Sequence, residues 1–230
     1  MNSRARIVFA GAHRSAQRGV ALFFALICMV AIMLAAVMLV RSVDTATLIA
    51  GNLAFQQSAT RSGDSGTEAA IAWLATTQTA NSTTNVLSDP THPFNVDAPT
   101  NGYYASLDPS VCLTGTCTGT PPPNPAGRTS YVNLAWDSTH SKSVGTDATT
   151  GNTVSYVIQR MCAASGVAIA NTNCLFSGAA LNNNGQNIPL PQQVCNGPGC
   201  PVAGQTPMIR VTSKVTGPKN TVSYVQALIY

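Results

Sequence analysis

The sequence predicts an α+β protein in which a long N-terminal helix, with a transmembrane first half, packs on a C-terminal head built from an antiparallel β-sheet. Three observations predict this fold class. An uncharged apolar run fills residues 20–40, helical spacing of apolar residues continues to residue 77, and segments rich in Val, Ile, Tyr and Thr follow. We expect a leader at 1–19, a transmembrane helix at 20–40, its extramembrane continuation at 41–77 and a disulfide-stapled head at 78–230.

The apolar run is the strongest signal in the sequence. Residues 20–40 contain no charged side chain, no amide, no Gly and no Pro. A helix of about 20 apolar residues rises about 30 Å, which matches the hydrocarbon thickness of a bilayer. The alternative is the buried helix of a soluble protein, which usually shows a polar stripe. This run has none, so the sequence favours a membrane helix.

The leader fixes the expected topology. Residues 1–19 carry four basic side chains and no acid, which holds the N-terminus in the cytoplasm and places the head outside it. The basic residues are Arg4, Arg6, Arg14 and Arg18. Without them the formal net charge falls from +4 to zero, so the basic balance is a topology signal. We therefore expect no nucleic-acid partner.

The junction between leader and helix indicates how the chain is processed. A secretory signal ends its apolar core after about 7 to 15 residues at a small-x-small site, and this core is longer. The other route cuts directly after a glycine, and here Gly19 is followed at once by Val20. This junction resembles that of a type IV prepilin. The resemblance implies cleavage after Gly19 by a prepilin peptidase and methylation of the new N-terminus at Val20.

Two further features indicate which pilin the chain resembles. Major pilins generally have Glu at the fifth mature position, where this chain has Phe24, and a subunit without that buried acid is expected to be a minor one. The chain also resembles PilX-type minor pilins in its first third and its last few dozen residues. The matching pieces are Arg41, Ala50 to Asn52, Phe55, Gln56, Glu68 to Ala70, YVIQRM at 156–161 and the closing segment 208–230.

The resemblance implies a non-enzymatic structural subunit of a type IV pilus that acts in pilus assembly or priming, with adhesion and twitching motility as associated roles. It implies no cofactor. The implied partners are prepilin peptidase, other minor pilins, the major pilin, a large pilus-tip adhesin and inner-membrane lipid. The subunit would lie in the inner membrane before assembly and in the extracellular pilus afterwards. Two alternatives stay open: a type II secretion pseudopilin, and a membrane-anchored extracytoplasmic binding module.

Beyond the membrane run, apolar residues at three- and four-residue spacing predict that the helix continues. Val43, Ala46 and Ala50 share one face. Gly63 and Gly66 each cost up to about 1 kcal/mol relative to Ala, which predicts a loosened or kinked section there. A true break into two helices stays open as the alternative.

The head is predicted to be a sheet with long polar inserts. Strands are expected at 103–107, 130–136, 153–161, 208–216 and 221–229, from their Val, Ile, Tyr and Thr content. The last two strands are separated by Gly217, Pro218, Lys219 and Asn220, which predicts an antiparallel hairpin. Segments 118–130, 138–151 and 181–193 are expected to be loops, because they are polar and rich in Gly, Pro or Asn.

Six of the seven cysteines lie in the head, and an even number predicts disulfides in an oxidising compartment. Loop-closure entropy favours nearest-neighbour pairing among the allowed connectivities. The pairs in that scheme are Cys112 with Cys117, Cys162 with Cys174, and Cys195 with Cys200. Zinc is the alternative, because the two C-x4-C pairs fit structural zinc spacing, but the extracytoplasmic topology argues against a metal. Cys28 is expected to act as a small apolar side chain.

No catalytic constellation emerges from the sequence. His92 and His140 lie in polar segments and are expected to be solvated. Asp64, Asp137 and Asp147 are too widely spaced to predict a dyad, and no G-x-S-x-G or phosphate-binding loop is present. The aromatic side chains of the head are open to two interpretations, core packing or a binding face, and core packing is the commoner role of aromatic residues in strands.

Overall fold

The computed structural model describes residues 18–178, 200–201, 205–218 and 220–230. The chain divides into two compact units between Ala54 and Phe55, and we describe each unit by itself. The predicted loop 181–193 lies outside the described residues.

The helix α1 runs without interruption from Arg18–Ala80, over 63 residues. It starts two residues before the predicted apolar run and ends three residues after the predicted limit at residue 77. Gly63 and Gly66 lie inside it, so the alternative of two separate helices is wrong. Its first part belongs to the first unit and its last 26 residues, 55–80, belong to the second.

Three long antiparallel strands form the centre of the head: β5 (Thr153–Arg160), β6 (Ile209–Thr216) and β7 (Val222–Ile229). β6 pairs with β5 on one side and with β7 on the other, both antiparallel. The predicted hairpin between β6 and β7 is therefore confirmed. Its turn includes Asn220 in the left-handed region (φ 56°), which Asn tolerates better than most residues.

The second edge of β5 is shared by two short strands. β4 (Lys142–Thr146) pairs antiparallel with the first half of β5, and β1 (Tyr103–Tyr104) pairs parallel with its second half. The sheet is consequently mixed, and the prediction of a wholly antiparallel sheet holds only for β4 to β7. β4 also corrects the expectation that 138–151 is only a loop. It escaped prediction because its side chains are polar or small and all five of its residues are exposed, so no apolar alternation marks a strand.

The remaining elements are small. β2 (Val111–Cys112) and β3 (Val132–Asn133) form a separate parallel pair, and two 3₁₀ turns occupy Pro99–Asn101 and Ile169–Asn171. The predicted strands 103–107 and 130–136 thus shrink to two residues each. β1 is short because β5 ends at Arg160, one residue beyond the partner of Tyr104, and β3 is short because its partner β2 has only two residues.

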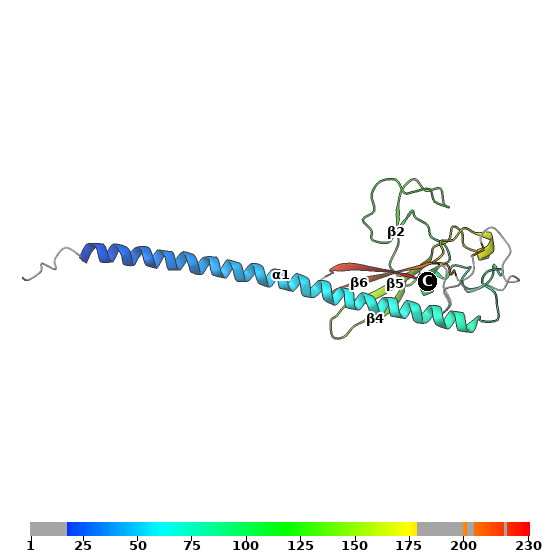
Figure 1. The fold of residues 1–230 in the computed structure, drawn as a ribbon, viewed down its shortest axis with the longest axis horizontal. Helices are drawn as coiled ribbons and strands as arrows, with labels where there is room; N and C mark the ends of the chain where they lie inside the picture. Colours follow the sequence, from blue (N-terminus) through cyan, green and yellow to red (C-terminus); the bar gives the residue numbers. More distant parts are fainter. Residues whose placement is uncertain (1–17, 179–199, 202–204, 219) are drawn as a thin grey trace, which may run out of the picture. The chain divides into compact units, whose positions relative to one another are not determined.

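The last part of α1 packs on the sheet through small residues. Gly63, Gly66 and Ala70 are buried at three- and four-residue spacing, which places them on one face of the helix. A Cβ atom added at Gly63 would lie 2.5 Å from Val225 Cγ2, and one at Gly66 would lie 2.5 Å from Ser213 Oγ. The strands therefore approach this section of α1 at distances that only glycine permits. Figure 1 shows the last part of α1 running alongside the strands of the head.

An aromatic cluster continues this contact at the end of α1. Trp73 packs against Tyr103 with 5.2 Å between ring centroids, and Phe94 packs against Tyr103 at 5.9 Å. Tyr103 and Tyr156 are 0% and 3% exposed, so both belong to the hydrophobic core. On the other face of the sheet, the ring of Trp136 lies 5.9 Å from that of Tyr224.

Candidate functional site

The apolar part of α1 is the first candidate site. Its large side chains are exposed throughout residues 20–40, from 46% at Ile27 to 71% at Leu22. Among the described residues, α1 is one helix long and apolar enough to cross a membrane. Helices hydrophobic on all sides require an apolar environment, which is lipid or other helices. By length and composition, this segment is therefore able to cross a membrane.

The predicted processing residues lie at the start of this helix. Gly19 is the second residue of α1, and an added Cβ would meet nothing within 4 Å. Val20 follows at 56% exposure. The rest of the leader, residues 1–17, lies outside the described residues. Cys28 is unpaired and exposed on the same apolar surface.

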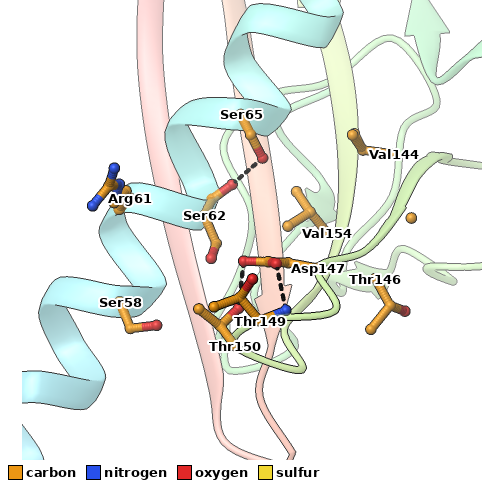
Figure 2. A pocket seen from close by; sticks show the side chains of 11 residues that line it. Ser58, Arg61, Ser62, Ser65, Val144, Thr146, Asp147, Thr149, Thr150 and Val154 are labelled. Atoms are coloured by element: carbon orange, nitrogen blue, oxygen red, sulfur yellow. Dashed lines mark hydrogen bonds between the residues drawn. The ribbon is translucent and has the colours of Figure 1, made fainter.

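A groove of about 590 Å³ forms the second candidate site, between α1 and the β4–β5 hairpin (Figure 2). Its helix side is lined by Ser58, Ser62 and Ser65, and its hairpin side by β4 and the turn that follows. Asn152 joins the two sides, because its Nδ2 donates to Ser58 Oγ at 3.0 Å and to Ser62 Oγ at 2.9 Å. Since Asn152 is 5% exposed, this contact is a buried polar link between helix and sheet.

Asp147 is the acidic residue that lines this groove, and residues of its own turn already hydrogen-bond to its carboxylate. Its carboxylate accepts the Thr149 amide at 2.8 Å and the Thr150 hydroxyl at 2.8 Å (Figure 2). These hydrogen bonds lower its pKa, with the Thr149 amide as the largest cause. Arg61 also lines the groove but points away from Asp147 (Figure 2). The lining of the groove thus presents serine and threonine hydroxyl groups, and among its lining residues no base lies beside a nucleophile.

The candidate acid–base residues are not brought together into a site. Asp137 pairs with His140, with 2.9 Å between Oδ1 and Nδ1, and this hydrogen bond is the main cause that lowers the Asp137 pKa. The neighbouring Ser141 hydroxyl donates to the Asp137 carbonyl, so this exposed pair stabilises its turn. Asp64 lies on α1 and Asp147 in the groove. The pairing of Asp137 with His140 was missed because an i,i+3 spacing in a turn gives no distinctive sequence pattern.

His92 corrects a prediction. It was expected to be solvated and is 1% exposed, packed 5.3 Å from the ring of Phe94. Its Nδ1 accepts the Phe94 amide at 3.1 Å, which makes the buried ring neutral, and desolvation lowers its pKa. His92 therefore helps to order the segment after α1.

Two disulfides lie in the described residues. Cys112 is bonded to Cys117 and Cys162 to Cys174, which are two of the three nearest-neighbour pairs. Cys200 is also disulfide-bonded, and Cys195 lies outside the described residues. Across the described ranges, no group of three or more His, Cys, Asp or Glu side chains is arranged to hold a metal ion.

A buried arginine is the feature that sequence reasoning missed. Arg160 ends β5 with 2% exposure, and its Nε donates to the Ala105 carbonyl at 2.9 Å. Its Nη1 donates to Asn95 Oδ1. Burial lowers the pKa of this guanidinium. In the sequence, Arg160 reads as the polar end of a strand, and nothing local indicates that the 92–105 segment closes over it.

Comparisons with protein-family models, with curated proteins and with solved structures found no match to this chain.

Proposed function

We propose that this chain is a minor pilin of the PilX type, a non-enzymatic subunit of a type IV pilus that acts in assembly or priming. The observation that carries the proposal is that one uninterrupted helix has an exposed apolar surface in its first part and a packed surface of small residues in its last part. Gly19 precedes a run that is apolar and exposed over residues 20–40, and small residues then pack the same helix against a sheet. Such a helix suits a subunit that moves from lipid into a bundle of similar helices.

The mechanism in this proposal is association. The apolar part of α1 leaves the inner membrane and packs among other pilin helices. This transfer is possible because lipid and a helix bundle are both apolar surroundings, and the helix hydrogen-bonds its own backbone in either one. The head then contacts other minor pilins, the major pilin and a pilus-tip adhesin from the outside of the cell. The two described disulfides support this location, because such bonds persist in oxidising compartments.

The proposal treats the head as a contact surface and assigns it no catalysis. The groove beside α1 offers serine and threonine hydroxyls, and its carboxylate is held by its own turn. The same physics fits a pseudopilin of a type II secretion system, which differs in what the filament serves. Deletion of the gene separates these two: loss of surface pili supports the pilin, and loss of protein export with intact pili supports the pseudopilin.

The test is the N-terminal sequence and mass of the protein from membranes of cells with and without prepilin peptidase. We expect a mature chain that begins at N-methylated Val20 only when the peptidase is present. Gly19→Leu should block this cut, whereas the matched control Gly51→Leu, a glycine of the same helix, should leave it unchanged.

Two outcomes would overturn the proposal. A leader that stays intact in both strains would make the chain an uncut membrane anchor, and the binding-module alternative would then be preferred. A cut after the apolar run would indicate a secretory signal, which releases the head without the helix. In either case the helix could not enter a filament.

A further inference from the structure

The sheet has a second face, opposite to the one that packs on α1. Along β5, Tyr156 and Ile158 share the core cluster with Ala70 of the helix. Successive side chains of a strand point to opposite faces, so Val157 and Gln159 face away from α1. Both line a cleft of about 410 Å³, which the β2–β3 pair lines from its other side. This volume lies in the usual range of small-molecule sites, about 300 to 1,000 Å³.

Gln159 brings an unused hydrogen-bond donor to this cleft. The residue is 4% exposed, and its Oε1 accepts hydrogen bonds from Nε and Nη2 of Arg210. Its Nε2 has no hydrogen-bond partner among the described residues. In that part of the chain, the side-chain atoms that are sealed from solvent without a partner belong to His92, Arg160 and Ser213. Gln159 Nε2 is not one of them, so it keeps access to the cleft that its residue lines.

Two carboxylates line the same cleft, and they differ in how they are paired. Asp108 forms an ion pair with Arg128, with 2.8 Å between Oδ2 and Nη1. Asp97 accepts the Ala105 amide through Oδ1 at 2.7 Å and has no ion-pair partner in the described part of the chain. Arg128 thus balances one carboxylate, and the negative charge of Asp97 disfavours an anionic ligand. Asp97 Oδ2 stays available as an acceptor.

Tyr104 supplies an aromatic surface to the cleft. Its hydroxyl donates to the His140 carbonyl at 3.0 Å, which fixes the position of the ring. Burial, with a smaller contribution from Asp97, raises the pKa of Tyr104 to about 12, so the hydroxyl stays neutral. Val157 and Leu113 contribute aliphatic lining. The cleft therefore combines a free donor and a free acceptor with aromatic and aliphatic surface.

We propose that this cleft binds a neutral sugar, whose hydroxyls accept from Gln159 Nε2 and donate to Asp97 while a C–H face of its ring packs on Tyr104. The ligand must both accept and donate, which a hydroxyl does. An ammonium group cannot accept from Gln159, and a carboxylate cannot donate to Asp97. A purely apolar ligand would leave the amide without a partner. The site does not rest on the pilin proposal, and neither result changes the other.

A peptide backbone also carries a donor and an acceptor, and it is the rival ligand. A sugar ring offers several such groups on adjacent carbons within a small volume, together with the apolar C–H surface that suits an aromatic ring. The cleft is lined on two sides, by the sheet and by the β2–β3 pair, which favours a compact ring over an extended chain. The sugar therefore fits more of the lining than the peptide does.

The test uses the full chain in lipid nanodiscs and measures binding by calorimetry. The probes are the methyl glycosides of glucose, galactose, mannose and N-acetylglucosamine. Each hexose is compared with its uronic-acid and amino-sugar analogues, and a capped dialanine represents the peptide backbone. We expect saturable binding of at least one neutral glycoside with a Kd of about 1 mM or below. Its charged analogues and the capped dialanine should bind at least about tenfold more weakly.

Two matched pairs of variants locate the binding in this cleft. Gln159→Glu keeps the acceptor for Arg210 and removes the Nε2 donor, so it should weaken the glycoside at least about tenfold. Gln226→Glu adds the same charge at an exposed position of β7 that does not line the cleft, and it should leave the affinity within about twofold.

The second pair covers the case in which Gln159→Glu fails to fold. Asn133→Trp fills the cleft from the exposed strand β3 and should abolish binding, whereas Thr129→Trp, exposed and outside the lining, should not change it. No saturable binding by any neutral glycoside, equal or tighter binding by a charged analogue or the dialanine, or unchanged binding in Asn133→Trp would each overturn the proposal.

Discussion

The two ends of α1 meet different surroundings with the same backbone. Over residues 20–40 the side chains are large, apolar and at least 46% exposed where they are bulky. Over residues 62–70 the inward side chains are small, and Ser62 and Ala70 are 8% and 0% exposed. Both stretches satisfy their backbone groups within the helix. Side-chain size therefore decides which neighbour each stretch accepts.

The comparison shows that glycine has opposite meanings in one helix. Gly51 has open space around it, so its missing side chain only weakens helix propensity. Gly63 has the same propensity cost, but its missing side chain is the space that Val225 fills. Packing against β7 recovers more than the propensity loses, because close-packed interiors gain dispersion contacts that a gap would forfeit.

The largest expected effect on stability is that of replacing Gly63 by leucine, with the same replacement at Gly51 as the control. Gly63→Leu should lower the free energy of unfolding of the head by about 3 kcal/mol, because the new side chain must displace Val225. Gly51→Leu should leave that free energy within about 0.5 kcal/mol. Denaturation in micelles, followed by tryptophan fluorescence, measures this, since both tryptophans, Trp73 and Trp136, lie in the compact unit formed by residues 55–230. Equal losses in the two variants would contradict the packing role of Gly63.

A smaller loss of stability is expected when the buried hydrogen bond between Asn152 and Ser62 is removed. Asn152→Ala should lower the free energy of unfolding by about 1 to 2 kcal/mol, because it leaves the buried Ser62 hydroxyl without its donor. A double-mutant cycle with Ser62→Ala checks the origin of the loss. Once Ser62 is removed, the Asn152 change should cost less, and strictly additive losses would show that the contact does not stabilise the head.

The smallest expected effect is a pH dependence that belongs to the head. Desolvation lowers the pKa of buried His92. As the pH falls, His92 is therefore protonated more readily in the unfolded chain than in the folded chain, and this favours unfolding. Stability should be complete above the ordinary histidine pKa of about 6.5 and should fall below it, by about 1 kcal/mol or less between pH 7 and pH 6. Urea denaturation at both pH values measures this. His92→Gln should remove that share of the slope, and an unchanged slope would assign it to other groups.

Sequence patterns predicted the features whose signal is local. The apolar run at 20–40 and the alternation of β6 are properties of neighbouring residues, and the structure has both the helix and the hairpin. The extent of α1 was nearly right because amphipathic spacing persists beyond the membrane run. These elements required no knowledge of what packs on them.

The missed features all depend on contacts between distant segments. β4 has the composition of a polar loop and becomes a strand because β5 offers an edge to pair with. Gly66 reads as a weak point of a helix until Ser213 and Val154 are placed beside it. The buried arrangement of Arg160 with Asn95 joins positions 65 residues apart, and no local pattern encodes that meeting.

The nearest-neighbour disulfides have a consequence for how the chain matures. Cys112 meets Cys117 and Cys162 meets Cys174 with no other cysteine between the members of either pair. An oxidant that joins thiols in the order in which the ribosome delivers them would thus form both bonds correctly at the first attempt. Production of these two crosslinks then requires a donor of oxidising equivalents, and it does not require an isomerase to reshuffle mispaired intermediates.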